Sequence, residues 1–150
     1  MNVLPGYPLL QKLVFLAGIG QISLVLASLA VPRILGWREE MARLKPLTRQ
    51  VFTTYAFYIV GTNLAFGLLS ALAPGWLLAP TGLAAAVTAF MAVYWGARVV
   101  IQFTYYDRSG GPSGAGARLA EAALVSLFLF LTVVYGCAAL RNGLGMGRPS

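Results

Sequence analysis

The sequence predicts an all-α integral membrane protein: a four-helix bundle with a short interfacial amphipathic helix between helices one and two. Apolar residues make up 59% of the chain and charged residues 10%, whereas soluble chains carry about 45–50% and about 25%. Four apolar runs are long enough to cross a hydrocarbon core of about 30 Å, which takes about 20 helical residues. Membrane-spanning strands would be shorter than these runs and would alternate apolar and polar residues, so the runs indicate helices and not strands. We expect one transmembrane domain over residues 1–150.

Each predicted span ends where helix-breaking or flexible residues begin. Pro32 closes the first span and Pro74 the second, while Pro80 is tolerable in the first turn of the third, which starts at Leu77 or Leu83. The glycine-rich linker 109–116 precedes the fourth. The first run lacks a basic segment before it, so we interpret it as a membrane helix and not as a cleaved signal. The predicted spans are 9–31, 51–73, 77–103 and 119–140.

The amphipathic helix is predicted from the segment between the first two spans. Ile34, Trp37, Met41 and Leu44 recur there at three- and four-residue spacing, with charged residues between them. Pro46 ends the pattern. This periodicity indicates a helix lying on the membrane surface and anchored by the tryptophan; a partner-binding helix is the alternative.

Loop charges predict the orientation of the chain. Basic residues concentrate between the first and second spans and between the third and fourth, and the second loop carries none. The positive-inside rule places the basic loops in the cytoplasm, so a multi-pass protein of the bacterial inner membrane has both termini in the periplasm. Because these cations face lipid headgroups, the net charge of +7 predicts membrane lipids as partners and no nucleic acid.

Several kinds of chemistry are excluded by composition. Histidine is absent, which removes the usual haem ligands, most zinc sites and the commonest general base. Cys137 is the single cysteine and is interpreted as a small apolar residue in a helix. No pair of carboxylates occurs in the membrane for acid–base work, and the glycine-rich loop has no P-loop lysine. We therefore predict no catalytic residue, no metal and no cofactor.

The third span has a small-residue side. Small residues recur along it at spacings of three and four, and they allow helix backbones to approach closely in lipid. We predict a packing seam, within one chain or between protomers of a homo-oligomer. The residues are Gly82, Ala85, Ala89, Ala92 and Gly96.

A second stripe on the third span is polar. Tyr94, Arg98 and Gln102 are spaced by four residues and are expected on one face, with Tyr105 near the end of the span. At about 1.5 Å per residue, Arg98 lies roughly 7–12 Å inside the cytoplasmic end. In the simplest interpretation, its side chain snorkels to the surface.

Arg98 has two alternative roles. Glu121, near the cytoplasmic end of the fourth span, has a matching depth, so an Arg98–Glu121 ion pair completed by Gln102 and a tyrosine hydroxyl is predicted. Asp107 is the other nearby carboxylate. Alternatively, Arg98 binds an anionic headgroup or a small anion.

Polar residues also fall near mid-membrane: Gln21 on the first span, Thr62 and Asn63 on the second, Thr88 on the third and Thr132 on the fourth. We interpret them as interhelical hydrogen-bonding residues. A polar path through the membrane is the alternative. A path for protons or cations would require an acidic residue at that depth, and the sequence has none there.

Two segments carry a family resemblance. Residues 44–72 and 94–107 resemble a group of small, uncharacterised bacterial four-helix membrane proteins, which implies no particular activity. Ala97-Arg98, followed by Phe103 and Tyr105, is also similar to the third helix of the microsomal glutathione transferase family, trimeric four-helix enzymes. That family's second-helix arginine–asparagine–glutamate motif is missing, so glutathione chemistry would rest on architecture alone.

Three functions are therefore expected in order of preference. The first is a non-enzymatic complex subunit or lipid-interacting scaffold, as a homo-oligomer or within a larger membrane complex. The second is a small transporter or channel for an anion or anionic lipid that uses Arg98. The third is a membrane enzyme of the glutathione-transferase type.

Overall fold

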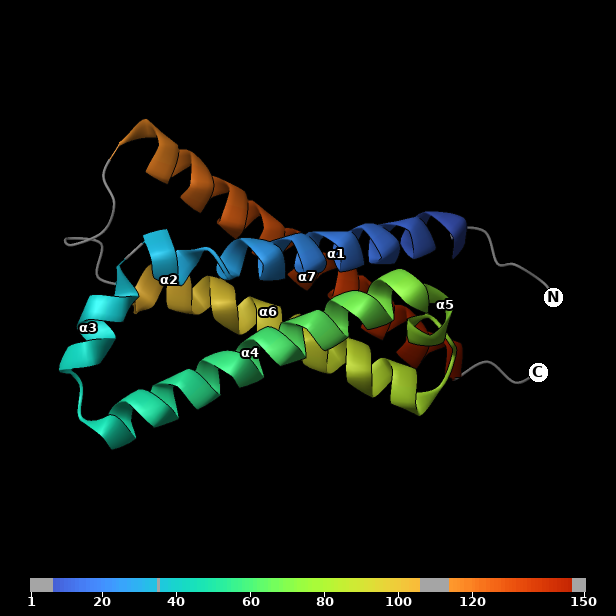
Figure 1. Ribbon diagram of the computed structural model, residues 1–150. Coiled ribbons are helices and arrows are strands. Elements are labelled where there is room, and N and C mark those ends of the chain that lie inside the picture. Colours follow the sequence, from blue (N-terminus) through green and yellow to red (C-terminus); the bar gives the residue numbers. More distant parts are fainter. Residues whose placement is uncertain (1–6, 35, 106–113, 147–150) are drawn as a thin grey trace.

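The computed structural model describes residues 7–34, 36–105 and 114–146, and these are helical apart from short connections. The prediction of an all-α bundle is confirmed. Four of the helices are long and apolar enough to cross a membrane, and Figure 1 shows them extending along the length of the molecule. They are α1 (Tyr7–Ser28), α4 (Pro46–Leu72), α6 (Gly82–Thr104) and α7 (Ala115–Met146).

The long helices are arranged as two pairs. α6 packs lengthwise on α7, α4 packs on α1, and contacts between α1 and α7 join the pairs. The backbones of α1 and α4 approach closely: a Cβ added to Gly18 would be 2.5 Å from the Ala71 nitrogen and 2.8 Å from the Gly67 oxygen. Trp95 and Tyr135, both fully buried, are the largest side chains of the core that the pairs share.

Three short helices complete the described part of the chain: α2 (Val31–Ile34), α3 (Trp37–Arg43) and α5 (Pro74–Leu77). α3 is the helix predicted between the first two spans. The Trp37 ring meets the Phe52 ring edge-on at 5.5 Å, so the predicted anchor residue also packs against the start of α4. Gly36, with a φ of 64°, supplies the left-handed residue before α3, a conformation that residues with a Cβ adopt at a cost.

The boundaries differ from prediction at several helix ends. α1 ends at Ser28 and not at 31, and Pro32, predicted to close the first span, lies inside α2. The third span begins at Gly82, one residue before the alternative predicted start at Leu83 and not at 77, because Thr81 caps it by accepting a hydrogen bond from the Ala84 amide at 3.2 Å. Leu77 belongs to α5 and Pro80 lies outside any helix. α4 begins at Pro46, where the missing amide hydrogen costs nothing. α7 runs to Met146, beyond the predicted end at 140.

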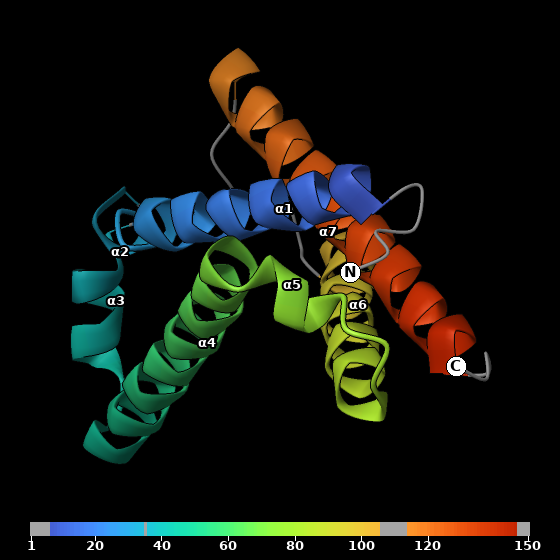
Figure 2. The same cartoon turned by 90° about the vertical axis from the view of Figure 1, so that its right-hand side faces the viewer.

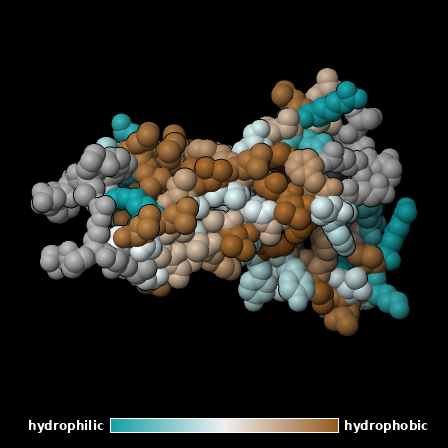
Figure 3. Space-filling view, turned by 180° about the vertical axis from the view of Figure 1, so that it is seen from behind, coloured by the Kyte–Doolittle hydropathy of each residue, from teal (hydrophilic) through white to brown (hydrophobic). Residues whose placement is uncertain are grey.

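The bundle is closed at one end and open at the other. At the α5 end, Leu77 and Leu78 are each 2% exposed. At the opposite end, the first half of α4 and the first third of α7 diverge from α1 and α6 (Figures 1 and 2). Figure 3 shows an apolar belt around the middle, with most of the hydrophilic residues on this side gathered at the open end. We call this the basic end, because it carries Arg33, Arg38, Arg43, Lys45, Arg49 and Arg118.

Candidate functional site

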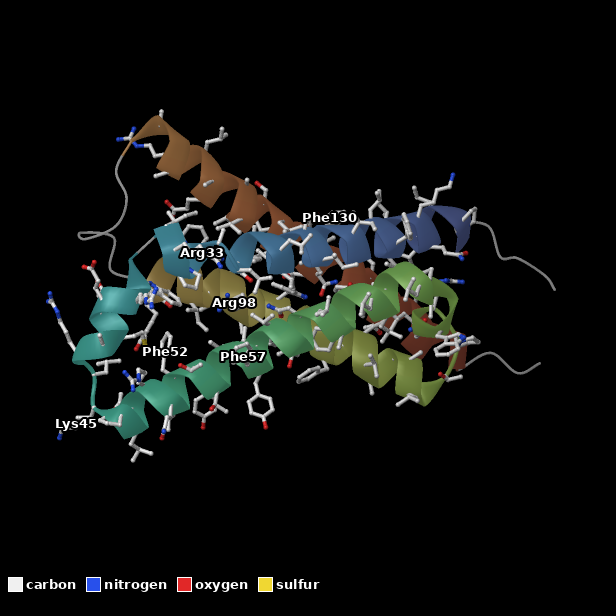
Figure 4. The ribbon with its side chains drawn as sticks, in the orientation of Figure 1. Arg33, Lys45, Phe52, Phe57, Arg98 and Phe130 are labelled. Carbon is white, nitrogen blue, oxygen red and sulfur yellow. The ribbon has the colours of Figure 1, made fainter. Side chains whose placement is uncertain are left out.

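Arg98 lies on α6 near the basic end and is half-buried. It is about 9 Å from the end of the helix at Thr104, at about 1.5 Å per residue. Its guanidinium carbon lies 5.7 Å from the centre of the Phe128 ring, within the range of a cation–π interaction. Figure 4 shows the side chain extending from α6 toward α1. The charge is therefore held inside the bundle by an aromatic face of α7.

The predicted Arg98–Glu121 ion pair does not form among the described residues. Instead, Gln102 Nε2 donates a hydrogen bond to Glu121 Oε1 at 3.3 Å. The reason is the antiparallel packing of α6 and α7. Arg98 contacts Phe128, and Glu121 is about 10 Å farther along α7 at about 1.5 Å per residue, in the direction in which Gln102 lies on α6. Asp107 lies outside the described residues.

The polar stripe of α6 also separates into two sides. Tyr94 donates to Asn63 Oδ1 at 2.9 Å and packs edge-on against Phe66 at 5.6 Å, so it faces α4. Successive residues four apart are offset by about 40° around a helix with 3.6 residues per turn. Gln102 is therefore turned by about 80° from Tyr94 and faces α7. Tyr105 follows the helix and is 81% exposed.

A groove of about 570 Å³ lies beside Arg98, between α1, α6 and α7. Its volume is within the range of about 300–1,000 Å³ that is usual for small-molecule sites. Arg98 and Gln102 line it from α6, and Ser23 and Ser28 add hydroxyls from α1. The remaining lining is apolar and includes Gly20, Leu24 and Ala27 of α1 and Ala123, Leu127 and Phe128 of α7.

The groove exists because α7 diverges from α1 toward the basic end (Figures 1 and 2). Along this stretch of α7 small side chains such as Ala120 and Ala123 are exposed and do not fill the space. An apolar channel with one cation at an intermediate depth can hold an amphiphile, with the chain against the apolar walls and the negative group at the arginine.

Of the mid-membrane polar residues, Gln21 and Asn63 make interhelical hydrogen bonds, whereas the Thr88 and Thr132 hydroxyls donate to carbonyls of their own helices. Gln21 Nε2 donates to the Tyr135 hydroxyl and to the Ala17 carbonyl, the latter at 3.3 Å. The Tyr135 hydroxyl also shares a hydrogen bond of 2.6 Å with Ser70 Oγ. Gln21, Ser70 and Tyr135 are each 0% exposed, so α1, α4 and α7 meet at one buried hydroxyl. Asn63, 6% exposed, joins α4 to α6 through Tyr94.

Three buried polar residues, Ser70, Tyr135 and Asn142, were not predicted from the sequence. Asn142 Nδ2 donates to the Leu77 carbonyl at 2.8 Å and lies 3.5 Å from Thr88 Oγ1. It therefore joins α7 to α5 and α6 at the closed end of the bundle. Asn142 fell outside the fourth predicted span, which ends at 140. A tyrosine in the middle of an apolar run was a usable signal for Tyr135, since a buried hydroxyl requires a partner.

The small-residue stripe of α6 is divided between packing and exposure. A Cβ on Gly96 would be 3.5 Å from Thr132 Cγ2 of α7, and Ala92 and Ala85 are half-buried. Gly82 and Ala89 are exposed. The part of the stripe nearest Arg98 therefore packs within the chain.

Within residues 7–34, 36–105 and 114–146 there is no group of three His, Cys, Asp or Glu residues that could hold a metal ion.

Comparisons with known proteins leave the family open. Neither a protein-family model, nor a curated protein sequence, nor a solved structure matches the chain. The resemblances to uncharacterised four-helix proteins and to microsomal glutathione transferases have no support beyond residues 44–72 and 94–107, and the chain stands as a small membrane protein with four apolar helices.

Proposed function

We propose that the chain is a non-enzymatic, lipid-interacting protein of the bacterial inner membrane, a scaffold or complex subunit that holds one anionic amphiphile in the groove between α1, α6 and α7. The basic end faces the cytoplasm, as the positive-inside rule requires. The groove then opens in the inner leaflet, and its occupant comes from that leaflet.

The observation that carries this proposal is the position of Arg98 in the groove. Its guanidinium contacts an aromatic ring and forms no ion pair with a carboxylate of the described residues. An arginine within an apolar span is costly to place, and the phosphate diester or carboxylate of an amphiphile would offset that cost through charge-assisted hydrogen bonds. Ser23, which lines the same groove, can donate a further hydrogen bond through its hydroxyl.

The depth of Arg98 agrees with such a ligand. A group about 9 Å inside the helix end, at about 1.5 Å per residue, lies where the acidic group and the first methylenes of an amphiphile meet. Each methylene buried against the groove wall contributes about 0.8 kcal/mol. The apolar lining therefore supplies affinity and Arg98 supplies the preference for negative charge.

Native mass spectrometry of the full-length protein in a mild detergent tests the proposal. We expect a retained anionic phospholipid or fatty acid, and titration with phosphatidylglycerol, phosphatidylcholine and oleate separates the two sources. Arg98→Gln should weaken retention by roughly tenfold to a hundredfold, since hydrogen bonds to charged groups contribute about 1.5–3 kcal/mol. Ala123→Trp, which fills the groove without changing charge, should also release the ligand.

The control is Arg43→Gln, which removes the same charge from an exposed position on α3. It should retain lipid as the unaltered protein does. Equal retention by Arg98→Gln, by Ala123→Trp and by the control would contradict the proposal, as would the same affinity for phosphatidylcholine as for phosphatidylglycerol.

A further inference from the structure

The outer face of α4 carries polar side chains that point away from the rest of the chain. Thr54, Tyr58, Gly61, Thr62 and Ala65 share one side of the helix by their spacing, and we call them the hydroxyl face. The residues of α4 that are buried are Asn63, Gly67 and Ser70, on the opposite side of the helix, where they face the rest of the bundle. In Figures 1 and 2, α4 leaves the bundle toward the basic end, so no other helix of the described residues covers this face.

The hydroxyl groups of this face lack partners. Four other threonine hydroxyls of the spanning helices donate to the backbone carbonyl four residues earlier, at 2.6–2.8 Å: Thr53, Thr88, Thr104 and Thr132. In contrast, Thr54, Tyr58 and Thr62 make no hydrogen bond within the described part of the chain. Tyr58 is 70% exposed.

These hydroxyls lie within the hydrocarbon region. Arg49 marks the interface on α4, and Tyr58 and Thr62 are about 13 and 20 Å from it, at about 1.5 Å per residue. The hydrocarbon core is about 30 Å thick. Lipid tails offer no hydrogen bond, so a polar group facing them is unfavourable until a protein surface supplies a partner.

The face also has room for another helix. A shallow hollow of about 590 Å³ lies along it, bounded by Thr54, Phe57, Tyr58, Gly61, Thr62 and Ala65. A Cβ built on Gly61 meets no atom within 4 Å. Gly61 and Ala65 are four residues apart, the spacing at which small residues let two helix backbones approach.

We propose that the hydroxyl face is the interface through which a second copy of this chain binds, α4 against α4. A hydroxyl both donates and accepts, so the face is complementary to itself, as a two-fold interface requires. Two copies inserted with the same orientation have their two-fold axis along the membrane normal. Each hydroxyl therefore lies at the same membrane depth as the equivalent hydroxyl of the second copy. A partner of another sequence would need polar groups placed independently at the same depths.

Cysteine cross-linking in native membranes tests the face directly. In full-length protein carrying Cys137→Ser, Ala65→Cys should form a disulfide-linked dimer on oxidation. Ile59→Cys is the matched control, because it lies on the same helix one residue from Tyr58 and is 44% exposed, but faces another side. Equal cross-linking of the two variants, or none at Ala65→Cys, would overturn the proposal.

Paired glycine substitutions test the association without altering the fold of one chain. Gly61→Leu should weaken the dimer by about tenfold or more, because the bulky side chain separates the helix backbones. Gly136→Leu is the control, since a Cβ there also meets no atom within 4 Å but lies on α7. The readout is the mass of the full-length protein in nanodiscs across a range of protein-to-lipid ratios.

Monomers at every ratio for the unaltered protein, or dimers that persist in Gly61→Leu as in Gly136→Leu, would refute the second-copy interface. A complex with a different protein through the same face would refute it too. The result is independent of lipid retention in the groove, because no residue of the hydroxyl face lines that groove.

Discussion

Tyr135→Phe gives the sharpest test of how the bundle is held together. The substitution removes one oxygen and keeps the ring, which is 0% exposed in the core. That oxygen accepts a hydrogen bond from Gln21 Nε2 and shares one of 2.6 Å with Ser70 Oγ. Both partners are themselves fully buried, so water does not replace the lost group.

The expected loss follows from these two hydrogen bonds. Interhelical hydrogen bonds in membrane proteins contribute about 0.6 kcal/mol on average and up to about 1.7 kcal/mol. Gln21 keeps its bond to the Ala17 carbonyl, which limits the cost on α1, whereas Ser70 loses its partner on α7. We expect the free energy of unfolding to fall by about 1–3 kcal/mol.

The assay is reversible unfolding of the full-length protein in mixed micelles, followed by circular dichroism as the denaturing detergent is increased. Tyr55→Phe is the control, because it makes the same chemical change at a side chain that is 65% exposed on α4. The double variant Tyr135→Phe, Ser70→Ala should lose less than the sum of the single variants, since they share one bond. A Tyr135→Phe protein as stable as Tyr55→Phe would refute the reasoning.

Two further predictions concern packing and orientation. Gly18→Ala should reduce the free energy of unfolding by about 1–3 kcal/mol, because the added methyl would lie 2.5 Å from the backbone of α4. The control Gly136→Ala should leave the melting temperature in the same detergent nearly unchanged. Equal melting temperatures of the two variants would contradict the close approach of α1 and α4. In a Cys137→Ser background, a membrane-impermeant maleimide added to spheroplasts should label Trp76→Cys, at a position that is 76% exposed on α5. It should not label Glu39→Cys on α3. The opposite labelling pattern would mean that the chain has the opposite orientation.

Much of the fold could be predicted from the sequence, because helix length and loop character are local properties. Four apolar runs of sufficient length led to α1, α4, α6 and α7, and a three- and four-residue period led to α3. The errors lie at helix ends. The third span was started at 77 because Leu77 and Leu78 continue the apolar pattern, but α5 and the Thr81 cap interrupt it.

The candidate site was predicted only in part. Arg98 and Gln102 were singled out, and the structure places both on one groove. The contacts of Arg98 were not foreseen, because spacing along α6 says nothing about which residue of α7 is level with it. Phe128, an apolar residue among many in its span, carried no signal in the sequence.

The sequence alone determined that this chain is apolar, helical and long enough to cross a bilayer four times, since backbone hydrogen bonding in lipid leaves few other solutions for such runs. The tertiary structure decided which helices pair, where they diverge and which buried polar atoms meet. Those outcomes depend on the rotation and register of one helix against another. In lipid the apolar faces of different helices are nearly equivalent, so a few close contacts select the arrangement, among them Gly18 against α4 and Tyr135 between Gln21 and Ser70.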